Sequence, residues 1–316
     1  MRLGLVVASL SVFLALPSFS SDLRFERLPE TFPVAEAIAT LSERIPDIAA
    51  QRQIRQAQGK VRPTVIRNDS SDDALVFPAA GSVRGGGGTF FRSDITLVSM
   101  MDEPHDVIAI WLPRGGGANP GVRITLPAND EEYLPVTVED FVGTVFGLEN
   151  ALGSILVYAA NPDGSPDEFS FIDGYSRIWT SQPPPPARPD CTGLGSVSQD
   201  FPPVRFADSI SDFFAFAWGL RQDTAFRTNA GVVNLDATSA RSFTIRAEGS
   251  TGVVWETDVT VPPLALVQVS LPTGQNFGHV YVAFEPYDEA DYAWSGYAST
   301  VDNGTGDGWV SHAKQP

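Results

Sequence analysis

The chain of 316 residues is long enough for two ordinary domains, and its hydrophobic content of 43% is sufficient to form buried cores. A formal net charge of −17 argues against partners such as nucleic acid or anionic membranes, because phosphate contacts need clustered cations. The single cysteine, Cys191, excludes a disulfide within the chain, and 28 glycines with 25 prolines favour many turns over long helices.

Residues 1–20 have the pattern of a secretory signal peptide. Arg2 gives a positive start, Leu3 to Leu16 is an apolar stretch, and Ser18-Phe19-Ser20 is a small-x-small site, so we expect cleavage before Ser21. An uncleaved anchor is the alternative. No later stretch has the roughly eighteen apolar residues of a membrane span. The sequence therefore predicts an exported protein, extracellular, at the cell surface or periplasmic, with no membrane span in the mature chain.

Residues 21–60 are predicted to form a short helical leader. Ala35 to Gln58 is rich in helix-forming residues with an apolar spacing that suits one or two helices, interrupted at Pro46. This segment would dock on the following module or remain a separate leader.

The rest of the chain is predicted to be all-β. Its apolar segments are short and bounded by turn residues, and several, such as Phe243 to Ala247, alternate apolar and polar residues as half-buried strands do. Strands at this spacing without intervening helices suggest antiparallel sandwiches like immunoglobulin or fibronectin III domains. We expect two in tandem, residues 61–182 and 190–316, separated by a proline-rich linker at 183–189 that acts as a semi-rigid spacer.

The two modules match each other in sequence. The segment Thr89 to Asp94 matches Thr224 to Asn229, which lies 135 residues later, and the same offset aligns three further apolar segments. Two of these alignments join Ile108–Ile110 to Phe243–Ile245 and Ile124–Pro127 to Val259–Pro262. Further along, the offset falls to 125 and then 122, as in the pairs Gly153 with Gly278 and Gly174 with Gly296. The first copy therefore carries extra loop residues.

These motifs resemble a poorly characterised group of exported bacterial proteins with tandem immunoglobulin-like β-sandwich modules. The resemblance rests on Gly87 to Asp94 in the first module and on Leu220 to Asp223, Phe226 to Asn229 and Tyr297 to Asp307 in the second. It covers roughly residues 76–310 and implies the sandwich fold, but it implies no activity.

The sequence offers no catalytic residue. It contains no nucleophile elbow, zinc-protease or phosphate-loop motif, and His105, His279 and His312 lie far apart in the chain. Loop carboxylates would serve a glycoside hydrolase, although nothing selects a pair. The enzyme hypothesis therefore stands second to that of a binding protein.

Arg92 and Arg227 recur in register inside apolar strands. Each would either face a ligand or act structurally, packing its stem and pairing with Asp94 or a loop carbonyl. Recurrence in both copies favours the structural role, since a shared fold position explains it.

The segment Asp302 to Asp307 offers oxygen ligands at alternate positions, as calcium loops do, with Asp302, Asn303 and Asp307 as candidates, but it lacks the spacing and the closing glutamate of an EF-hand. Asp-Asn-Gly is equally a tight-turn sequence. A structural calcium ion is thus the alternative to a simple turn, and no other cofactor is expected.

The densest aromatic feature is the segment 213–218. As a strand it places Phe214, Phe216 and Trp218 on one face and the two alanines on the other. An exposed row would stack on sugar rings or dock a partner, whereas a row facing the core is the more ordinary outcome.

Together these features favour a secreted, non-enzymatic binding or structural protein that acts on an extracellular protein or glycan. The alternative is a secreted carbohydrate-active or other hydrolytic enzyme. The sequence leaves the oligomeric state and the identity of the ligand open.

Overall fold

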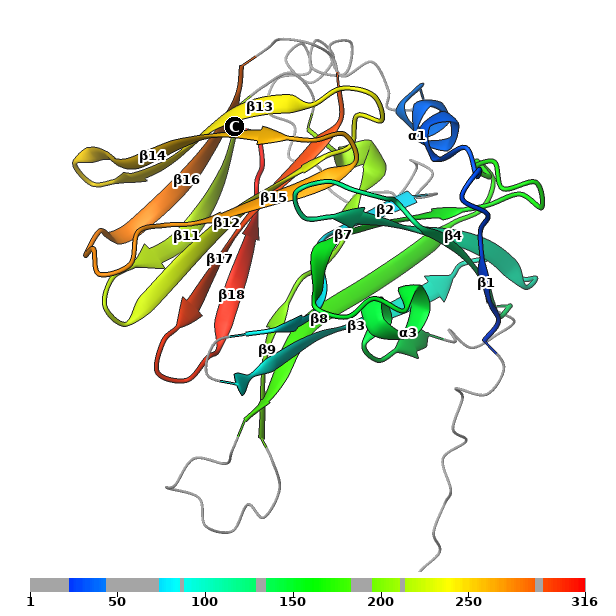
Figure 1. Cartoon of the computed structure of the whole chain (residues 1–316), viewed down its shortest axis with the longest axis horizontal. Helices are drawn as coiled ribbons and strands as arrows, with labels where there is room; N and C mark the ends of the chain where they lie inside the picture. Colours follow the sequence, from blue (N-terminus) through cyan, green and yellow to red (C-terminus); the bar gives the residue numbers. More distant parts are fainter. Residues whose placement is uncertain are drawn as a thin grey trace, which may run out of the picture.

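The structure, a computed structural model, describes residues 23–43, 74–85, 88–128, 135–182, 195–210, 214–287 and 292–315. Within these ranges the chain is mostly β and consists of antiparallel sheets, so the all-β expectation is confirmed (Figure 1). None of the helices in these ranges has the length and apolarity to cross a membrane. The expected signal peptide, residues 44–60 of the leader, the proline-rich linker and Cys191 lie outside the described residues.

The second half of the chain contains two four-stranded sheets whose inner faces share one core. The first has the order β11 (Ala215–Gln222), β16 (Gly278–Pro286), β13 (Arg241–Gly249), β14 (Gly252–Val261). The second has the order β15 (Ala265–Ser270), β12 (Phe226–Asn234), β17 (Trp294–Asp302), β18 (Gly308–His312). In β13 the alternate residues Phe243, Ile245 and Ala247 are buried, as the apolar alternation predicts. Phe243 meets Trp294 across the core with ring centroids 5.0 Å apart.

The first half repeats both strand orders. One set is β2 (Ala74–Arg84), β7 (Ala151–Ala159), β4 (His105–Pro113), β5 (Gly121–Leu126). The other is β6 (Val136–Val138), β3 (Phe90–Ser99), β8 (Ile172–Gln182), β9 (Gly195–Asp200). The end of β2 also pairs with β3, with Ser82 opposite Arg92, so the two sets join into one sheet. The helix α3 (Phe141–Phe146) packs on the core between them.

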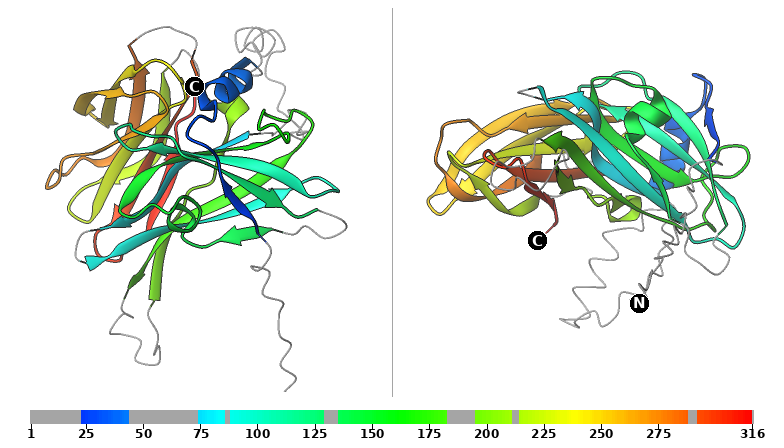
Figure 2. Two further views of the ribbon diagram at one scale, coloured as in Figure 1. Left: turned by 45° about the vertical axis from the view of Figure 1, so that its right-hand side comes forward. Right: turned by 90° about the horizontal axis from the view of Figure 1, so that it is seen from below.

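Two short strands extend this sheet. The strand β1 (Phe25–Arg27) pairs with β5, and β10 (Val204–Arg205) pairs with β2 and leads into a single 3₁₀ turn (Phe206–Asp208) (Figure 2).

The shared strand order supports the duplication, but β4 is shifted by one residue relative to the sequence alignment. Val107 pairs with Ile124 and Phe243 pairs with Val259, whereas the alignment had joined Ile108 to Phe243. A shift of one residue turns every side chain of a strand to the other face. Ile108 and Ile110 therefore face away from the first half's own core, while Phe243 and Ile245 face into that of the second.

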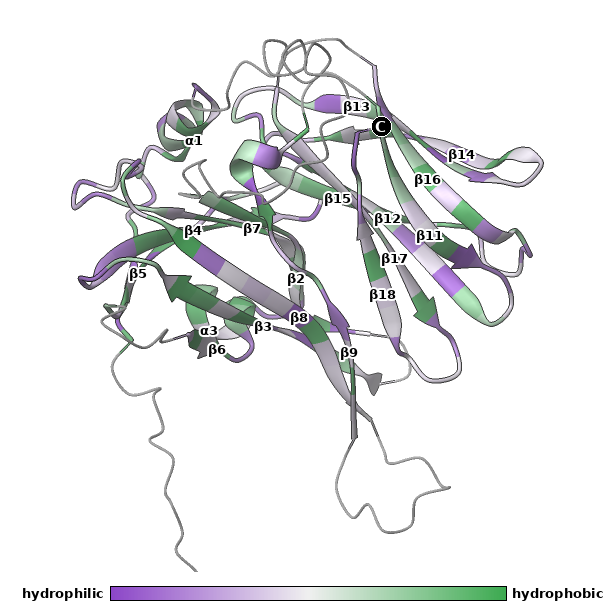
Figure 3. Cartoon of the chain, turned by 180° about the vertical axis from the view of Figure 1, so that it is seen from behind, coloured by the Kyte–Doolittle hydropathy of each residue, from purple (hydrophilic) through white to green (hydrophobic). Residues whose placement is uncertain are grey.

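A third core lies between the two halves. It joins the outward side chains of β2, β4 and β7 to residues of the second half and is closed by α1 (Val34–Glu43), which lies within the expected leader. Its central members are Ile108, Ile110, Leu156, Tyr158, Val233, Leu266 and Tyr297. Because both faces of β4 and β7 are covered, Val107 to Leu112 and Ile155 to Ala159 are continuous buried apolar runs and do not alternate (Figure 3).

The strand pairing also relocates the boundary between the halves. Residues 183–189 were expected to separate two modules, but the strands on either side of them, β8 and β9, pair antiparallel, with Gln182 opposite Gly195. The strand β9 therefore belongs to the sheet of the first half, and the boundary lies after β10. Hydrogen bonds cross it directly, including one from Asn119 Nδ2 to the Leu264 carbonyl at 2.9 Å. The halves are thus packed together and are not held apart by a spacer.

Candidate functional site

The aromatic row of β11 faces outward. Ala215 and Ala217 are fully buried, whereas Trp218 is 45% exposed and Phe214 is 41% exposed. The expected alternation is present, but the preferred orientation toward the core is wrong. The physical reason is volume, because the core beneath β11 is already filled by large rings such as Phe284 and leaves room only for the alanines.

A β-bulge directly follows Trp218, whose own outward direction continues the alternation of Phe214 and Phe216. The pairing of β11 with β16 shifts register between Ala217 and Leu220, and Gly219 has a φ of 73°, a backbone conformation that favours glycine. Because of this extra residue, both Trp218 and Gly219 lie on the exposed side. The indole N–H of Trp309 donates to the Gly219 carbonyl at 2.8 Å, which ties the bulge to β18.

The outward rings contact one another along and across strands. The ring centroid of Phe216 lies 5.4 Å from that of Phe214 and 6.0 Å from that of Trp218. It also lies 5.6 Å from that of Tyr281 on the neighbouring β16. Such pairs contribute beyond simple area burial and hold the rings in fixed orientations. The outer face of this sheet therefore presents a preorganised aromatic surface to solvent.

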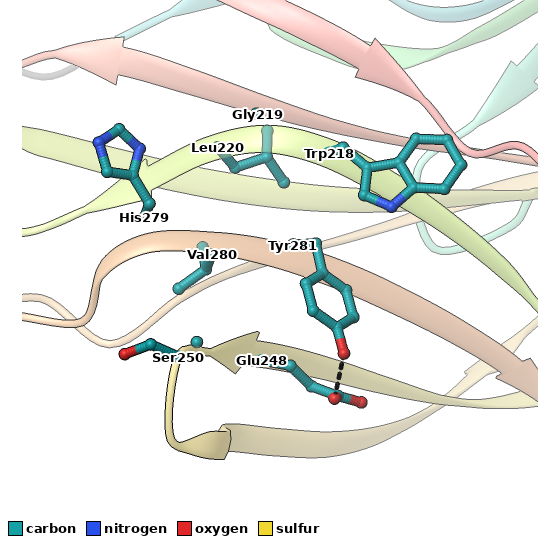
Figure 4. A pocket seen from close by; sticks show the side chains of 9 residues that line it. Trp218, Gly219, Leu220, Glu248, Ser250, His279, Val280 and Tyr281 are labelled. Carbon is teal, nitrogen blue, oxygen red and sulfur yellow. Dashed lines mark hydrogen bonds between the residues drawn. The ribbon is translucent and has the colours of Figure 1, made fainter.

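A groove of about 360 Å³ lies at the Trp218 end of this surface (Figure 4). It is lined by Trp218, Gly219, Leu220, Glu248, Gly249, Ser250, His279, Val280 and Tyr281. We refer to this set as the aromatic groove. Its floor comes from β16 and its walls from the β11 bulge and from the turn between β13 and β14.

Glu248 and Tyr281 are directly opposite each other on adjacent strands. The Tyr281 hydroxyl donates a hydrogen bond to Oε2 of Glu248, and this bond to a carboxylate raises the pKa of Tyr281. Arg246, one pleat further along, pairs with Glu285 at 2.8 Å and lies 3.9 Å from Oε1 of Glu248. The groove thus combines aromatic faces with an anchored carboxylate and a neighbouring ion pair.

Arg92 does not line the aromatic groove. Its guanidinium lies 4.8 Å from the centre of the Phe90 ring and 5.6 Å from that of Trp179, and its Nε is 3.8 Å from Asp140. The expected partner, Asp94, pairs with Arg177 at 3.0 Å instead. Arg92 borders a separate hollow of about 460 Å³ beside α3.

Arg227 also lies outside the groove, where its Nη1 donates to Oδ1 of Asn303 at 2.7 Å. These contacts fit the structural role that recurrence in both copies favours.

The loop considered for calcium forms the hairpin turn between β17 and β18. Oδ1 of Asp302 accepts the backbone N–H groups of Gly304 and Thr305 at 2.7 and 3.0 Å, and the carbonyl of Asp307 accepts the N–H of Asp302. Asn303 is engaged by Arg227. In the part of the chain that the structure describes, no three His, Cys, Asp or Glu side chains are grouped to hold a metal.

The carboxyl groups whose pKa values shift do not resemble a general acid. Burial alone would raise the pKa values of Asp106, Asp223 and Asp236, but hydrogen bonds and nearby arginines outweigh it and lower them. The pKa of Asp163 is lowered chiefly by hydrogen bonds from Ser165. Glycoside hydrolysis needs one carboxyl group with a raised pKa, so these four groups do not supply that role.

Sequence reasoning missed the residues of β13 and β16 that complete the groove, chiefly Glu248 and Tyr281. A signal for Tyr281 was present. In the segment Val280 to Phe284 the apolar residues Val280, Val282 and Phe284 alternate inward, which places Tyr281 on the opposite face. Glu248 could be found only from the pairing of β13 with β16, which is a long-range contact.

No protein family model, characterised protein or solved structure matches this chain significantly. The function is therefore argued from the site itself.

Proposed function

We propose that this chain is an exported, non-enzymatic glycan-binding protein whose ligand lies along the aromatic groove. The observation that carries the proposal is the outward orientation of Phe216, Trp218 and Tyr281 over a well-packed core. Large aromatic side chains that stay exposed beside one another on a folded surface are typical of binding sites. The core beneath β11 already contains other aromatic rings, so packing within the second half does not explain the row.

The chemistry of the groove suits a sugar chain. The apolar C–H face of a sugar ring packs against the flat face of an indole or phenol, and its hydroxyl groups need nearby hydrogen-bond partners. Glu248, Arg246 and Glu285 offer such partners on the same side of the sheet. Since these side chains stand on paired strands, little ordering is required when a ligand binds.

The proposed role concerns the second half alone. The face of β2, β4 and β7 that corresponds to the groove face is covered by the third core, whereas its counterpart on β11, β13 and β16 is open. The protein would therefore attach through one groove. The semi-rigid spacer expected at 183–189 is not part of this proposal.

We further propose that both halves descend from one immunoglobulin-like sandwich with its terminal strands exchanged. The pairs β12–β15 and β13–β16 correspond to the central B–E and C–F pairs of that fold. The first strand, β11, pairs with β16, and β17 pairs with β12, whereas the immunoglobulin order would place the first strand beside β12 and the last beside β16.

The test is a binding screen of the purified chain against soluble polysaccharides, followed by calorimetry on any that bind. The Trp218→Ala variant is expected to weaken binding by about tenfold or more, because buried aromatic anchors dominate interfaces. Phe169→Ala is the matched control, since Phe169 is 75% exposed in the first half, and it should bind like the unmodified chain. Unchanged binding by Trp218→Ala, or binding to proteins and to no glycan, would contradict the proposal.

A further inference from the structure

The aromatic groove lies on an acidic face. The outward positions of β13, β14 and β16 carry the carboxylates Glu248, Glu256, Asp258 and Glu285. Among the described residues of these three strands, Arg246 is the arginine that faces the same way, and it is engaged by Glu285 at 2.8 Å. At the margins of the face, Arg221 pairs with Asp223, and the backbone of Lys314 pairs with Phe216 at the edge of β11. The five carboxylates on and beside this face, Asp223 included, outnumber the three cations Arg246, Arg221 and Lys314, so the face carries a net negative charge.

Glu248 occupies the position from which a carboxylate can act on a bound ligand. Its side chain is 21% exposed and is fixed by the hydrogen bond that Tyr281 donates to Oε2. Oε1 lies 3.9 Å from the Nε of Arg246, which is beyond hydrogen-bond distance. One carboxylate oxygen is therefore held at the groove and still able to accept a donor, with the rings of Tyr281 and Trp218 on the same side of the sheet (Figure 4).

Aromatic faces beside a carboxylate distinguish ammonium groups from hydroxyl groups. The negative face of an indole or phenol ring attracts a cation, and a charged N–H donor forms a stronger hydrogen bond to a carboxylate than a neutral hydroxyl does. The net charge of −17 adds a long-range attraction for cationic ligands. Glycans rich in phosphate or uronic acid would be repelled by the negative charge of the protein.

We infer that the ligand of the aromatic groove is a glycan that carries protonated amino groups, with an ammonium group placed between Trp218, Tyr281 and Glu248. This inference rests on the proposed glycan-binding function and names its substrate class. Stacking on the aromatic rings supplies binding to any sugar chain, and Glu248 supplies the preference for the amine.

The experiment is calorimetry of the full chain with three hexasaccharides of glucosamine, N-acetylglucosamine and glucose, at low and high salt. The glucosamine oligomer is expected to bind about tenfold more tightly than the other two at low salt, and the difference should shrink at high salt. Glu248→Gln keeps an acceptor for the Tyr281 hydroxyl while removing the charge. It should abolish the preference and leave the weaker binding of the neutral oligomers. Glu149→Gln, an exposed carboxylate of the first half, is the matched control and should change neither.

The outcomes separate the two proposals. Equal affinity for all three oligomers, or a preference that survives Glu248→Gln, would overturn the amine inference while leaving glycan binding intact. Binding of polylysine as tight as that of the glucosamine oligomer, unchanged by Trp218→Ala, would also overturn it, because bulk charge would then explain the attraction. Affinities that Trp218→Ala leaves unchanged for every oligomer would overturn both proposals, whereas an absence of binding to all three would overturn the amine inference alone.

Discussion

Ile110 provides a sharp test of the packing between the two halves. Its side chain is fully buried in the third core, although the sequence alignment had placed it at the same inward position as Ile245. Replacing a buried isoleucine by alanine removes apolar contacts and leaves a cavity, which costs about 2–5 kcal/mol of unfolding free energy. With the observed register of β4, Ile110 would lie on a solvent-exposed sheet face if the halves did not pack together. The same substitution would then change stability by no more than about 0.5 kcal/mol.

Urea denaturation followed by both tryptophan fluorescence and far-ultraviolet circular dichroism distinguishes these cases. Ile110→Ala should lower the unfolding free energy by an amount comparable to Ile245→Ala, which empties a site in the core of the second half. The two probes should report one shared transition in the unmodified chain, because the third core couples the halves. A loss below about 0.5 kcal/mol for Ile110→Ala, with normal destabilisation by Ile245→Ala, would refute the packed arrangement.

Three further predictions concern single residues. Gly219→Ala should lower the unfolding free energy by about 1 kcal/mol in thermal or urea unfolding, because a β-carbon is disfavoured at its positive φ. Asp236 pairs with Arg241, and its pKa is lowered because hydrogen bonds outweigh burial. The ionised carboxylate therefore stabilises the fold above about pH 4, and this stabilisation is lost as the pH falls through the pKa of the folded state. Asp236→Asn should therefore lower the unfolding free energy measured in urea near pH 7. At acid pH it should leave that free energy almost unchanged. Burial, with Lys314 nearby, lowers the pKa of His312 to about 4, so stability should fall as pH drops below about 6.5 toward that value. His312→Asn should flatten this part of the pH profile of the urea midpoint, and an unchanged profile would argue against a buried neutral imidazole.

Much of the fold followed from short-range patterns. Alternation in Phe243 to Ala247 predicted a half-buried strand, and the repeated segments predicted two copies with one strand order. For the run from Val107 to Leu112, alternation could not predict which face meets the core of the first half, because a strand that is covered on both faces is apolar throughout. Its one-residue shift relative to β13 is likewise fixed by pairing with β5 and β7, which sequence spacing alone does not reveal.

The groove was only partly predictable for the same reason. The sequence placed Phe214, Phe216 and Trp218 on one face, but which face meets the core depends on how much volume the opposite sheet fills. The groove wall after Trp218 depends on a bulge that places Gly219 on the exposed side and is held by Trp309, 90 residues beyond Gly219 in the chain. The proline-rich segment was interpreted as a domain boundary because composition reports local stiffness and not which strands pair on either side.

The most direct test of the central claim uses the chain's six tryptophans as reporters, since the indole N–H signals of a ¹⁵N-labelled sample can be assigned by single substitutions. On titration with a glucosamine oligomer, the signal of Trp218 should move most, and that of Trp309, which holds the bulge, should follow. The signals of Trp294, fully buried, and Trp179, in the first half, should stay in place. Saturable movement of Trp179 with Trp218 unchanged would contradict a binding site on the outer face of β11 and β16.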